Sequence, residues 1–434
     1  MRPMAEASCA TRHNDRPMFG CSEHWIGRRF SHALTSFLSG ERERRELAAT
    51  DAVDAVALES RYESFRVDRA TALRAGGAAA AYALANVALS DAAPAATMKA
   101  DAWTTTTKPV PLGKVHVVPS TPKTVTLGLF DPAKAPVATI DSGDVVVYTN
   151  TWTHFLNKLQ PGVSADELAA MRKAGPGRGV HSIVGPVAVK GAKPGDLLEI
   201  RFLNLQTIDF GANFHNPGEM HTGSLPDDFA QGHVHYFKLD GADGFVEFSP
   251  KIKLELRPFQ GTFGVMPAGG AAVSSVAPGK HAGNIDCKEL IAGSSLYIPV
   301  QVDDAYVFTG DSHALQGDGE VNITAIETAM KEVRAQIILH PKQTAYAWPM
   351  IETPSHWLML GMDPSLNDAL RISLRNTIDF LSTKARLSRD DAYGLASLAV
   401  DFRISQMVDK NNGVHAMIPK SIFAADFRKT IAIV

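Results

Sequence analysis

Residues 188–205 read AVKGAKPGDLLEIRFLNL, two apolar-rich runs on either side of the turn Lys193-Pro-Gly-Asp196. Proline and glycine inside a short polar break are typical of a tight turn, so the two runs are predicted to be strands. The chain holds 34 Gly and 25 Pro, which fits a turn-rich fold. Further short β-rich segments lie at 115–118, 124–129, 144–151, 233–239, 245–256 and 295–309.

Helical patterns are fewer. Residues 164–174 have Ser164 as a candidate N-cap and Glu167 three positions on, which together form a capping box. The segments 365–386 and 388–408 give the last hundred residues a helical character. We therefore predict an α+β fold with a mainly antiparallel, β-sandwich-like body and C-terminal helices.

The composition excludes several classes of protein. The 434 residues carry a formal net charge of -3, with 45% hydrophobic and 21% charged residues, as in an ordinary soluble globular protein. Neither a nucleic-acid nor a membrane partner is indicated. There are three cysteines and no CxxC pair, which argues against a disulfide framework and a cysteine-rich zinc site.

Residues 1–110 differ from the rest of the chain. We predict a poorly structured N-terminal extension there, followed by one catalytic domain over 111–434. Within the extension, the stretch 75–96 has the apolar core and small-residue end of a secretory signal, preceded by a basic flank from residue 66. The protein is therefore expected to be cytoplasmic by default, and periplasmic if segment 66–96 acts as a signal peptide.

Two loops concentrate polar side chains. In the first, residues 281–288, Asn284 and Asp286 are two positions apart and would point to the same side of an extended chain. The second, residues 310–320, follows a β-rich run. Its four candidate ligands or bases are Asp311, His313, Asp318 and Glu320. The alternative reading of this second loop is a solvated Asp/Gly turn with a surface histidine.

Histidines elsewhere give weaker signals. His154 follows a predicted strand and is a candidate ligand or substrate contact, or else a surface histidine beside Trp152. The pair His233 and His235 has a common metal-ligand spacing, but two histidines on a strand more often mark a half-buried face. In the segment 215–221, Glu219 is a candidate ligand or a loop carboxylate.

Familiar catalytic motifs are missing from the sequence. It contains no G-x-S-x-G elbow, no H-E-x-x-H and no Walker loop. Cys287, Lys288 and Glu289 have the residue types of a nitrilase triad, but three consecutive side chains cannot converge on one carbonyl. A buried structural thiol is the simpler interpretation of Cys287.

Several of these stretches, taken in order, resemble the acetamidase/formamidase family. The similarity runs from about Pro111 to Phe427 and includes GKHAGNIDCKE at 279–289 and GDSHALQGDGE at 310–320. It also includes Glu352-Thr-Pro-Ser-His356 and Asp401-Phe-Arg-Ile-Ser-Gln406. The resemblance implies an oligomeric, metal-containing amidase that releases ammonia from formamide or acetamide.

The resemblance and the polar loops together give a hypothesis for the site. Without a credible nucleophilic triad, a water activated by a divalent metal is the economical nucleophile. Zn²⁺ is the expected metal, and Ca²⁺ suits the carboxylates as an alternative. The hypothesis lists the metal ligands as Asp286, His313, Asp311 and His154. It lists the catalytic residues as Glu320, with Asp318 as the alternative base, and Asn284, which could also be a ligand.

Two other functions fit the same residues. One is a hydrolase of another amide or of a cyclic C–N or C–O bond, and the other is a β protein that binds a small ligand without chemistry. A small amide and further copies of the chain, in a homo-oligomer, are the expected partners.

Overall fold

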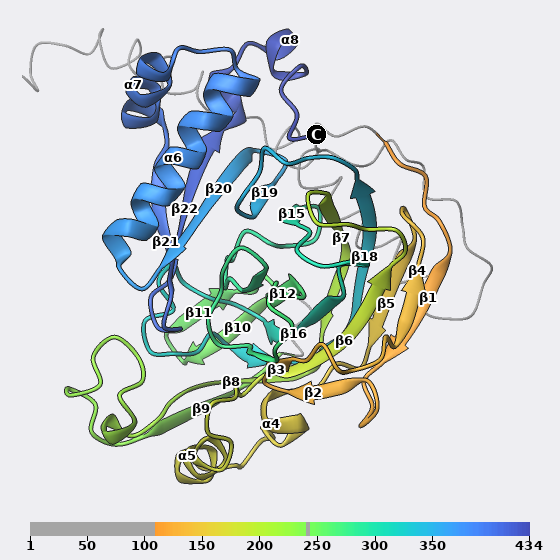
Figure 1. The fold of residues 1–434 in the computed structure, drawn as a ribbon. Coiled ribbons are helices and arrows are strands. Elements are labelled where there is room, and N and C mark those ends of the chain that lie inside the picture. The colour runs from red at the N-terminus through yellow and green to blue at the C-terminus, as the bar shows by residue number, and fades with distance from the viewer. Residues whose placement is uncertain (1–108, 240–243) are drawn as a thin grey trace, which may run out of the picture. The chain divides into compact units, whose positions relative to one another are not determined.

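The computed structural model describes residues 109–239 and 244–434 (Figure 1). Two large sheets and a few helices make up this region, and most strand pairs are antiparallel. The predicted α+β class, with a sandwich-like β body and helices near the C-terminus, is confirmed. Apart from residues 109 and 110, the N-terminal extension and its signal-like stretch 75–96 lie outside the described residues and stay predictions.

The first sheet has nine strands, in the order β1-β5-β18-β7-β15-β19-β20-β22-β21. Only β1 and β5 run parallel within it. The bounds are β1 Val115–Pro119, β5 Val145–Thr149, β18 Met330–His340, β7 Leu197–Thr207, β15 Ser295–Pro299, β19 Met350–Glu352, β20 His356–Asp363, β22 Asn412–Pro419 and β21 Asp401–Gln406.

The second sheet has the order β14-β12-β16-β17-β8-β9, and β6 pairs with β16, β2 and β4 beside that path. The bounds are β14 Ala282–Asn284, β12 Phe259–Val265, β16 Val307–His313, β17 Glu327–Thr328, β8 Phe210–His215, β9 His233–Lys238, β6 Ser182–Val189, β2 Val125–Leu127 and β4 Ala138–Ile140. Two small ladders complete the β structure: β10 Phe245–Ser249 with β11 Ile252–Glu255, and β3 Leu129–Phe130 with β13 Val273–Ser274.

The main core lies where the two sheets face each other. On β7, Leu198, Ile200 and Phe202 alternate into this core, where they meet Phe259 and Phe263 of β12. Alternate residues of a strand point to one face, so burial of this face fixes the register of β7. The turn predicted before β7 is present, and the Asp196 carboxylate accepts a hydrogen bond from the Lys193 backbone N–H at 2.9 Å.

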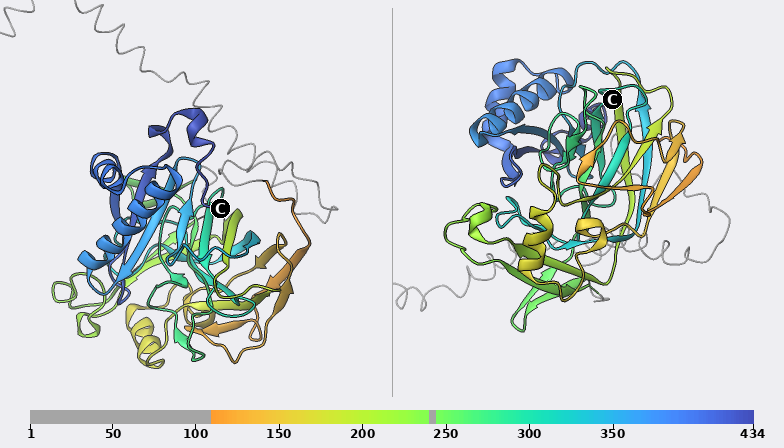
Figure 2. Two further views of the ribbon diagram at one scale, coloured as in Figure 1. Left: turned by 45° about the horizontal axis from the view of Figure 1, so that its top comes forward. Right: turned by 60° about the horizontal axis from the view of Figure 1, so that its bottom comes forward.

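The helices cover selected faces of the sheets. In Figures 1 and 2, α6 and α7 lie against β20, β22 and β21 on one side of the molecule. The capping box of α5 is confirmed, with Ser164 and Glu167 bonding each other's backbone N–H groups. The bounds are α4 His154–Asn157, α5 Ala165–Lys173, α6 Leu366–Lys384, α7 Arg389–Ala399 and α8 Ala425–Arg428, with 3-10 turns at Gly218–Met220 and Lys420–Ile422. Among the described residues, no helix is long and apolar enough to cross a membrane.

For one helix, the predicted start is correct and the predicted end is wrong. Helix α7 begins after the Ser388 cap, as expected, but it ends at Ala399 instead of continuing to residue 408. The β-branched Val400 leaves the helical conformation, and the next segment pairs along β22 as β21. Sheet pairing therefore overrides the local helical pattern, as tertiary context often does.

The packing of α6 on β20 predicts a sharp response to one methyl group. A Cβ at Gly361 would lie 2.3 Å from the Ala369 carbonyl oxygen and 2.5 Å from the Ser373 backbone nitrogen. Gly361→Ala should therefore lower the free energy of unfolding by about 1–3 kcal/mol, measured by urea denaturation. The control Gly394→Ala adds a methyl in open space on α7 and should raise it by about 0.5–1 kcal/mol. Equal effects of the two changes would contradict this packing.

Candidate functional site

A small pocket opens beside the second sheet and holds most of the candidate residues. Its free volume is about 20 Å³, little more than one or two water molecules need. Most of the lining side chains are buried. They are His154, Arg172, Val180, His181, Phe214, Val276, Asn284, Asp286, Asp311, Glu320, Ile323, Thr324, Glu327 and Asp409.

Strand pairing brings several of these residues together. His313 at the end of β16 pairs directly with Glu327 of β17. On the other side, Thr262 of β12 pairs with Asn284 of β14 and with Gly310 of β16. Side chains at neighbouring positions of adjacent strands lie close together, so the ladder itself assembles part of the site.

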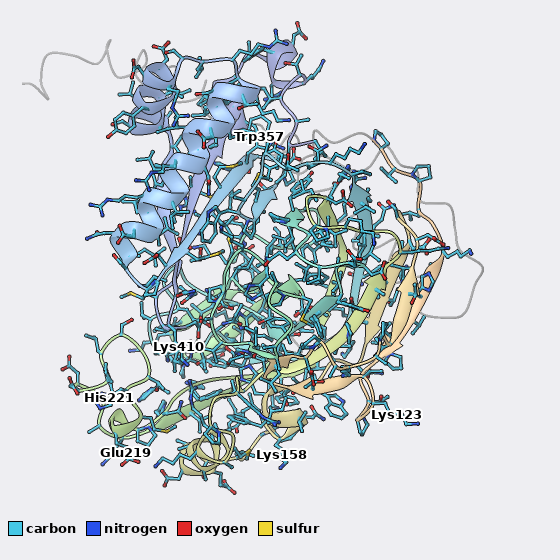
Figure 3. The ribbon with its side chains drawn as sticks, in the orientation of Figure 1. Lys123, Lys158, Glu219, His221, Trp357 and Lys410 are labelled. Atoms are coloured by element: carbon cyan, nitrogen blue, oxygen red, sulfur yellow. The ribbon has the colours of Figure 1, made fainter. Side chains whose placement is uncertain are left out.

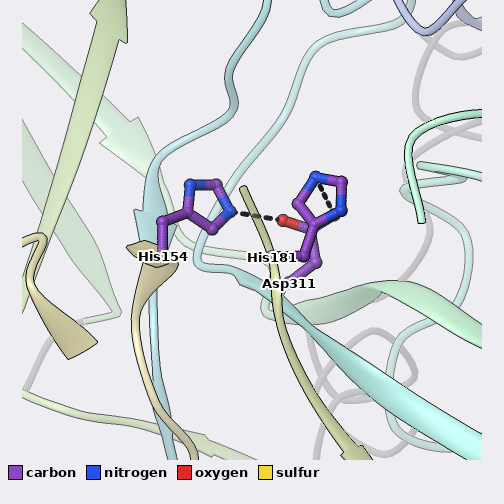
Figure 4. A group of neighbouring side chains, drawn as sticks. All are labelled: His154, His181 and Asp311. Carbon is purple, nitrogen blue, oxygen red and sulfur yellow. Dashed lines mark hydrogen bonds and ion pairs between the residues drawn. The ribbon is translucent and has the colours of Figure 1, made fainter. Parts of the chain in front are cut away.

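Asp311 lies at the centre of the group. Its Oδ1 is 2.8 Å from the Nε2 of His154, which stands on the short turn α4. Its Oδ2 is 4.0 Å from the Nε2 of His181, just before β6 (Figure 4). Burial opposes the charge on Asp311, but His181, His313 and the bond from His154 hold the pKa of its carboxyl well below the usual range.

Glu327 faces the same imidazoles. Its Oε2 lies 3.3 Å from His154 Nε2 and 3.2 Å from His313 Nε2, while Asp311 Oδ1 lies 3.3 Å from His313 Nε2. Two imidazole nitrogens and two carboxylate oxygens thus face one another at contact distances. Glu327 Oε2 nevertheless has no partner in hydrogen-bond geometry. An unsatisfied buried carboxylate oxygen requires an explanation, such as an ion.

The imidazoles divide into two kinds. Burial disfavours the charge on His313, yet Glu327 and Asp311 raise its pKa well above the usual range, and the pKa of His154 is raised by the same carboxylates. Burial instead lowers the pKa of His181 to about 4. The neutral His181 ring, held by Ser275 Oγ at 2.8 Å from its Nδ1, has the protonation state of a metal ligand.

A second group of carboxyls lies on the other side of His313. Burial and the neighbouring acids raise the pKa values of Asp286 and Glu320 well above their usual range, and burial raises that of Asp409 to about 7. Both carboxylate oxygens of Asp286 are buried without a hydrogen-bond partner. Carboxyls whose pKa is raised can exchange protons near neutral pH.

Polar side chains outside the pocket fix these groups. Gln316 Oε1 accepts a hydrogen bond from His313 Nδ1 at 3.0 Å, and Gln316 Nε2 donates to the Asp286 backbone carbonyl at 2.8 Å. Thr262 donates to Asn284 Oδ1 at 2.5 Å and lies 3.3 Å from Asp311 Oδ2. The site is therefore rigidly oriented by buried hydrogen bonds.

The backbone at the site is strained. Asp286, Asp311 and Glu320 have φ values of 42°, 57° and 46°, in the left-handed region that side chains normally avoid. This conformation costs roughly 1–3 kcal/mol per residue and persists where the surrounding structure imposes it. Three acidic residues are thus turned toward the pocket by backbone geometry that local sequence preference would not select.

Most residues proposed from the sequence converge here. Asp286, Asp311, His313 and Glu320 line or border the pocket, as do Asn284 and His154. Asp318, the alternative base, does not join them. Its exposed carboxylate lies 3.0 Å from Lys288 Nζ and lines no part of this pocket.

The other sequence candidates also lie elsewhere. Figure 3 places His221 and Glu219 on the loop at the far end of β8 and β9. His233 and His235 stand on β9 outside the pocket lining, and the ring of His235 stacks on Phe237. Cys287 is fully buried, and burial raises the pKa of its thiol far above the usual range, which is unsuited to a nucleophile.

Three lining residues escaped the sequence reasoning: Glu327, Asp409 and Arg172. Glu327 lies in a two-residue strand without flanking glycines, and Asp409 follows β21, just after the segment 388–408 that was predicted to be a helix. Arg172 lies within the predicted helix 164–174, without a motif that marks it. No local pattern marks these residues, because only strand pairing and chain crossing bring them to the pocket.

Comparison with known proteins gives consistent results. The model of the Acetamidase/Formamidase family matches residues 123–271 and 268–425. A formamidase from Methylophilus methylotrophus is 26% identical over 320 residues, which cover 57% of this chain and 78% of the relative. An acetamidase structure from Bacillus halodurans has 28% identity and a TM-score of 0.64, covering 71% of this chain and 98% of its own. An acetamidase structure from Yersinia enterocolitica also has 28% identity and a TM-score of 0.64, with 71% and 93% covered.

Gly261 on β12 provides a test of how tightly the cluster is packed. A Cβ there would lie 2.4 Å from Asp286 Oδ1, 2.6 Å from Asp311 Oδ2 and 2.7 Å from His313 Cε1. These atoms are buried and cannot move into solvent, so Gly261→Ala should destabilise the fold by about 1–3 kcal/mol in urea unfolding. Gly317→Ala, which meets no atom within 4 Å in the neighbouring loop, is the control. Similar unfolding midpoints for the two variants would refute the close packing.

Proposed function

The chain belongs to the acetamidase/formamidase family, and from this premise we propose that it hydrolyses small linear amides at the buried pocket with a divalent metal ion. The C–N bond of formamide or acetamide would be cleaved to release ammonia and a carboxylate. The small free volume of the pocket, about 20 Å³, favours small substrates over large ones. Family membership also favours an enzyme over the non-catalytic binder considered from the sequence.

One observation carries the metal proposal: the contact of two imidazole nitrogens with two carboxylate oxygens at 2.8–3.3 Å. Zinc ligands lie about 2.0–2.2 Å from the ion, so tetrahedral ligand atoms are roughly 3.3 Å apart. The spacing therefore fits a tetrahedral ion. The unpartnered Glu327 Oε2 supports the same interpretation.

The chemistry of the donors assigns the ligands. Asp311, His313 and Glu327 would hold the ion, since their ligand atoms lie within 4.8 Å of one another. The fourth position falls to His154 or to the substrate. Imidazole nitrogens favour Zn²⁺ over Ca²⁺, which prefers oxygen ligands alone. When bound, the ion would act as a Lewis acid on the amide and lower the pKa of water.

The remaining side chains would handle protons and orientation. Glu320, whose pKa is raised, can accept a proton from the attacking water and return it to the leaving amine. Thr262 occupies Asn284 Oδ1, which leaves the Asn284 Nδ2 to donate to the developing oxyanion. Asp286 would support Glu320 by helping to raise its pKa. In this scheme Glu320 would carry the proton, and the amide would be polarised at the metal site.

Two predictions from the sequence remain proposals. We propose a homo-oligomer, because the family resemblance implies one. We also keep the proposal that the protein is cytoplasmic unless segment 66–96 directs export.

Metal removal is the first test. Exhaustive chelation should abolish ammonia release from formamide and acetamide, and Zn²⁺ should restore it.

The raised pKa values of His313 and His154 mean that metal binding must displace protons below those pKa values. The apparent affinity for the metal should therefore rise by about tenfold per pH unit for each proton displaced. It should level off above the pKa values of the two histidines. Calorimetry in two buffers of different ionisation enthalpy measures the proton release. Turnover that survives chelation would overturn the proposal.

The base is tested by a pair of neighbouring carboxylates. Glu320→Gln keeps the size of the side chain but removes its proton-transfer function, so kcat should fall by about 10²–10⁴-fold. Asp318→Asn alters the exposed carboxylate two residues earlier and should leave kcat nearly unchanged. Circular dichroism melting verifies that both variants fold. If Asp318→Asn were the damaging change, the assignment of the base would be reversed.

A further inference from the structure

The mouth of the pocket is made by three side chains. Among the lining residues, only Arg172, Val276 and Ile323 are partly exposed, whereas the others are buried. They come from helix α5, from the segment after β13 and from the loop before β17. A ligand that enters the pocket therefore passes a guanidinium set between two aliphatic side chains.

Packing of α5 determines where Arg172 points. Leu168 of this helix is buried against Phe214 and Phe155, beneath β8 and β9. Arg172 is one turn further along the same face, because residues four apart in a helix are neighbours on its surface. The helix thus carries the guanidinium to the pocket rather than to bulk solvent, and burial lowers the pKa of Arg172.

The Arg172 side chain has no hydrogen bond or ion pair with any residue in the described part of the chain. Asp409 acts on it electrostatically, without forming an ion pair. The next cation on the helix behaves differently, since Lys173 Nζ lies 2.7 Å from Glu219 Oε1 on the surface. An unpaired guanidinium that is partly withdrawn from water is costly, and an anionic partner would offset that cost.

The acids of the pocket do not require Arg172 for neutralisation. Asp311 and Glu327 face the imidazoles of His154 and His313. Asp409 acts on Arg172 electrostatically but forms no hydrogen bond or ion pair with it. The guanidinium is therefore available to a ligand.

The aliphatic walls of the mouth are held in place. Ile323 has φ of 88°, a strained value for a β-branched residue, and its backbone N–H donates to the Glu320 carbonyl at 3.0 Å. Strain of this kind is maintained where a side chain must occupy one position. Ile323 thereby connects the mouth to the proposed base.

We propose that Arg172 binds a carboxylate at the mouth of the pocket. The planar guanidinium fork pairs with both oxygens of a carboxylate, which a point charge cannot do. The carboxylate has two possible sources: a carboxylate on the substrate beside its amide, as in oxamate, or the carboxylate product of hydrolysis, such as acetate. The link to turnover rests on the proposed amidase function, but carboxylate binding itself does not.

Direct binding is the first measurement. The full-length protein is titrated with acetate and with oxamate by calorimetry, as wild type, Arg172→Gln, Arg172→Lys and the control Lys173→Gln. Loss of a charge-assisted pair should weaken binding of at least one carboxylate by about 10- to 100-fold in Arg172→Gln. Arg172→Lys should recover part of the affinity, since it keeps the charge without the fork. Lys173→Gln should bind as wild type does.

Kinetics then separates the two sources. Oxamate is compared with isobutyramide, a neutral amide of similar shape, by the ratio of their kcat/KM values. If the substrate supplies the carboxylate, wild type prefers oxamate and Arg172→Gln loses that preference by about 10- to 100-fold. If the product supplies it, oxamate is not preferred, and inhibition by acetate weakens in Arg172→Gln.

Either result supports carboxylate binding by Arg172. Equal affinity of wild type, Arg172→Gln and Arg172→Lys for both carboxylates would overturn it, and the lysine variant retains the test if the glutamine variant does not fold. Acetate binding that depends on Arg172, in a protein that hydrolyses no amide, would reject the amidase proposal and leave this inference standing.

Discussion

Charge compensation inside the protein core determines the layout of the site. Asp311, Glu327, His154 and His313 are nearly inaccessible to solvent, and each of the two carboxylates faces an imidazole. An isolated charge at such a depth would cost several kcal/mol, so these groups must stay together. The strands that carry them are thereby held in one register. Gln316 and Thr262 extend the same constraint to the next layer of side chains.

Within this constraint, the backbone conformation also orients the acidic side chains of the site. The left-handed positions at Asp286, Asp311 and Glu320 turn three carboxyls toward one small volume. Gly261 leaves the space that they occupy, because any Cβ there would overlap two of them. Local strain and one missing side chain therefore produce the acidic pocket together, and neither would do so alone.

Much of this could be foreseen from the sequence, for physical reasons. The turn at 193–196 and the capping box at Ser164 are local signals, and both are present. The polar loops also identified most of the cluster, because glycine and several acids rarely gather without a role. Glu327 and Asp409 could not be found in that way, since their place depends on strand pairing and on a late chain crossing. The prediction of a helix over 388–408 was wrong in its second half for the same reason, because β21 pairs with β22.

The hydrogen bond between His154 and Asp311 spans 157 residues of the chain, and Asp409 enters the pocket from almost 100 residues further on. Contacts between distant segments form slowly, since long loops must close before any interaction rewards the closure. Because the pocket draws on segments so far apart in the chain, it is complete only when the segment that carries Asp409 has taken its place.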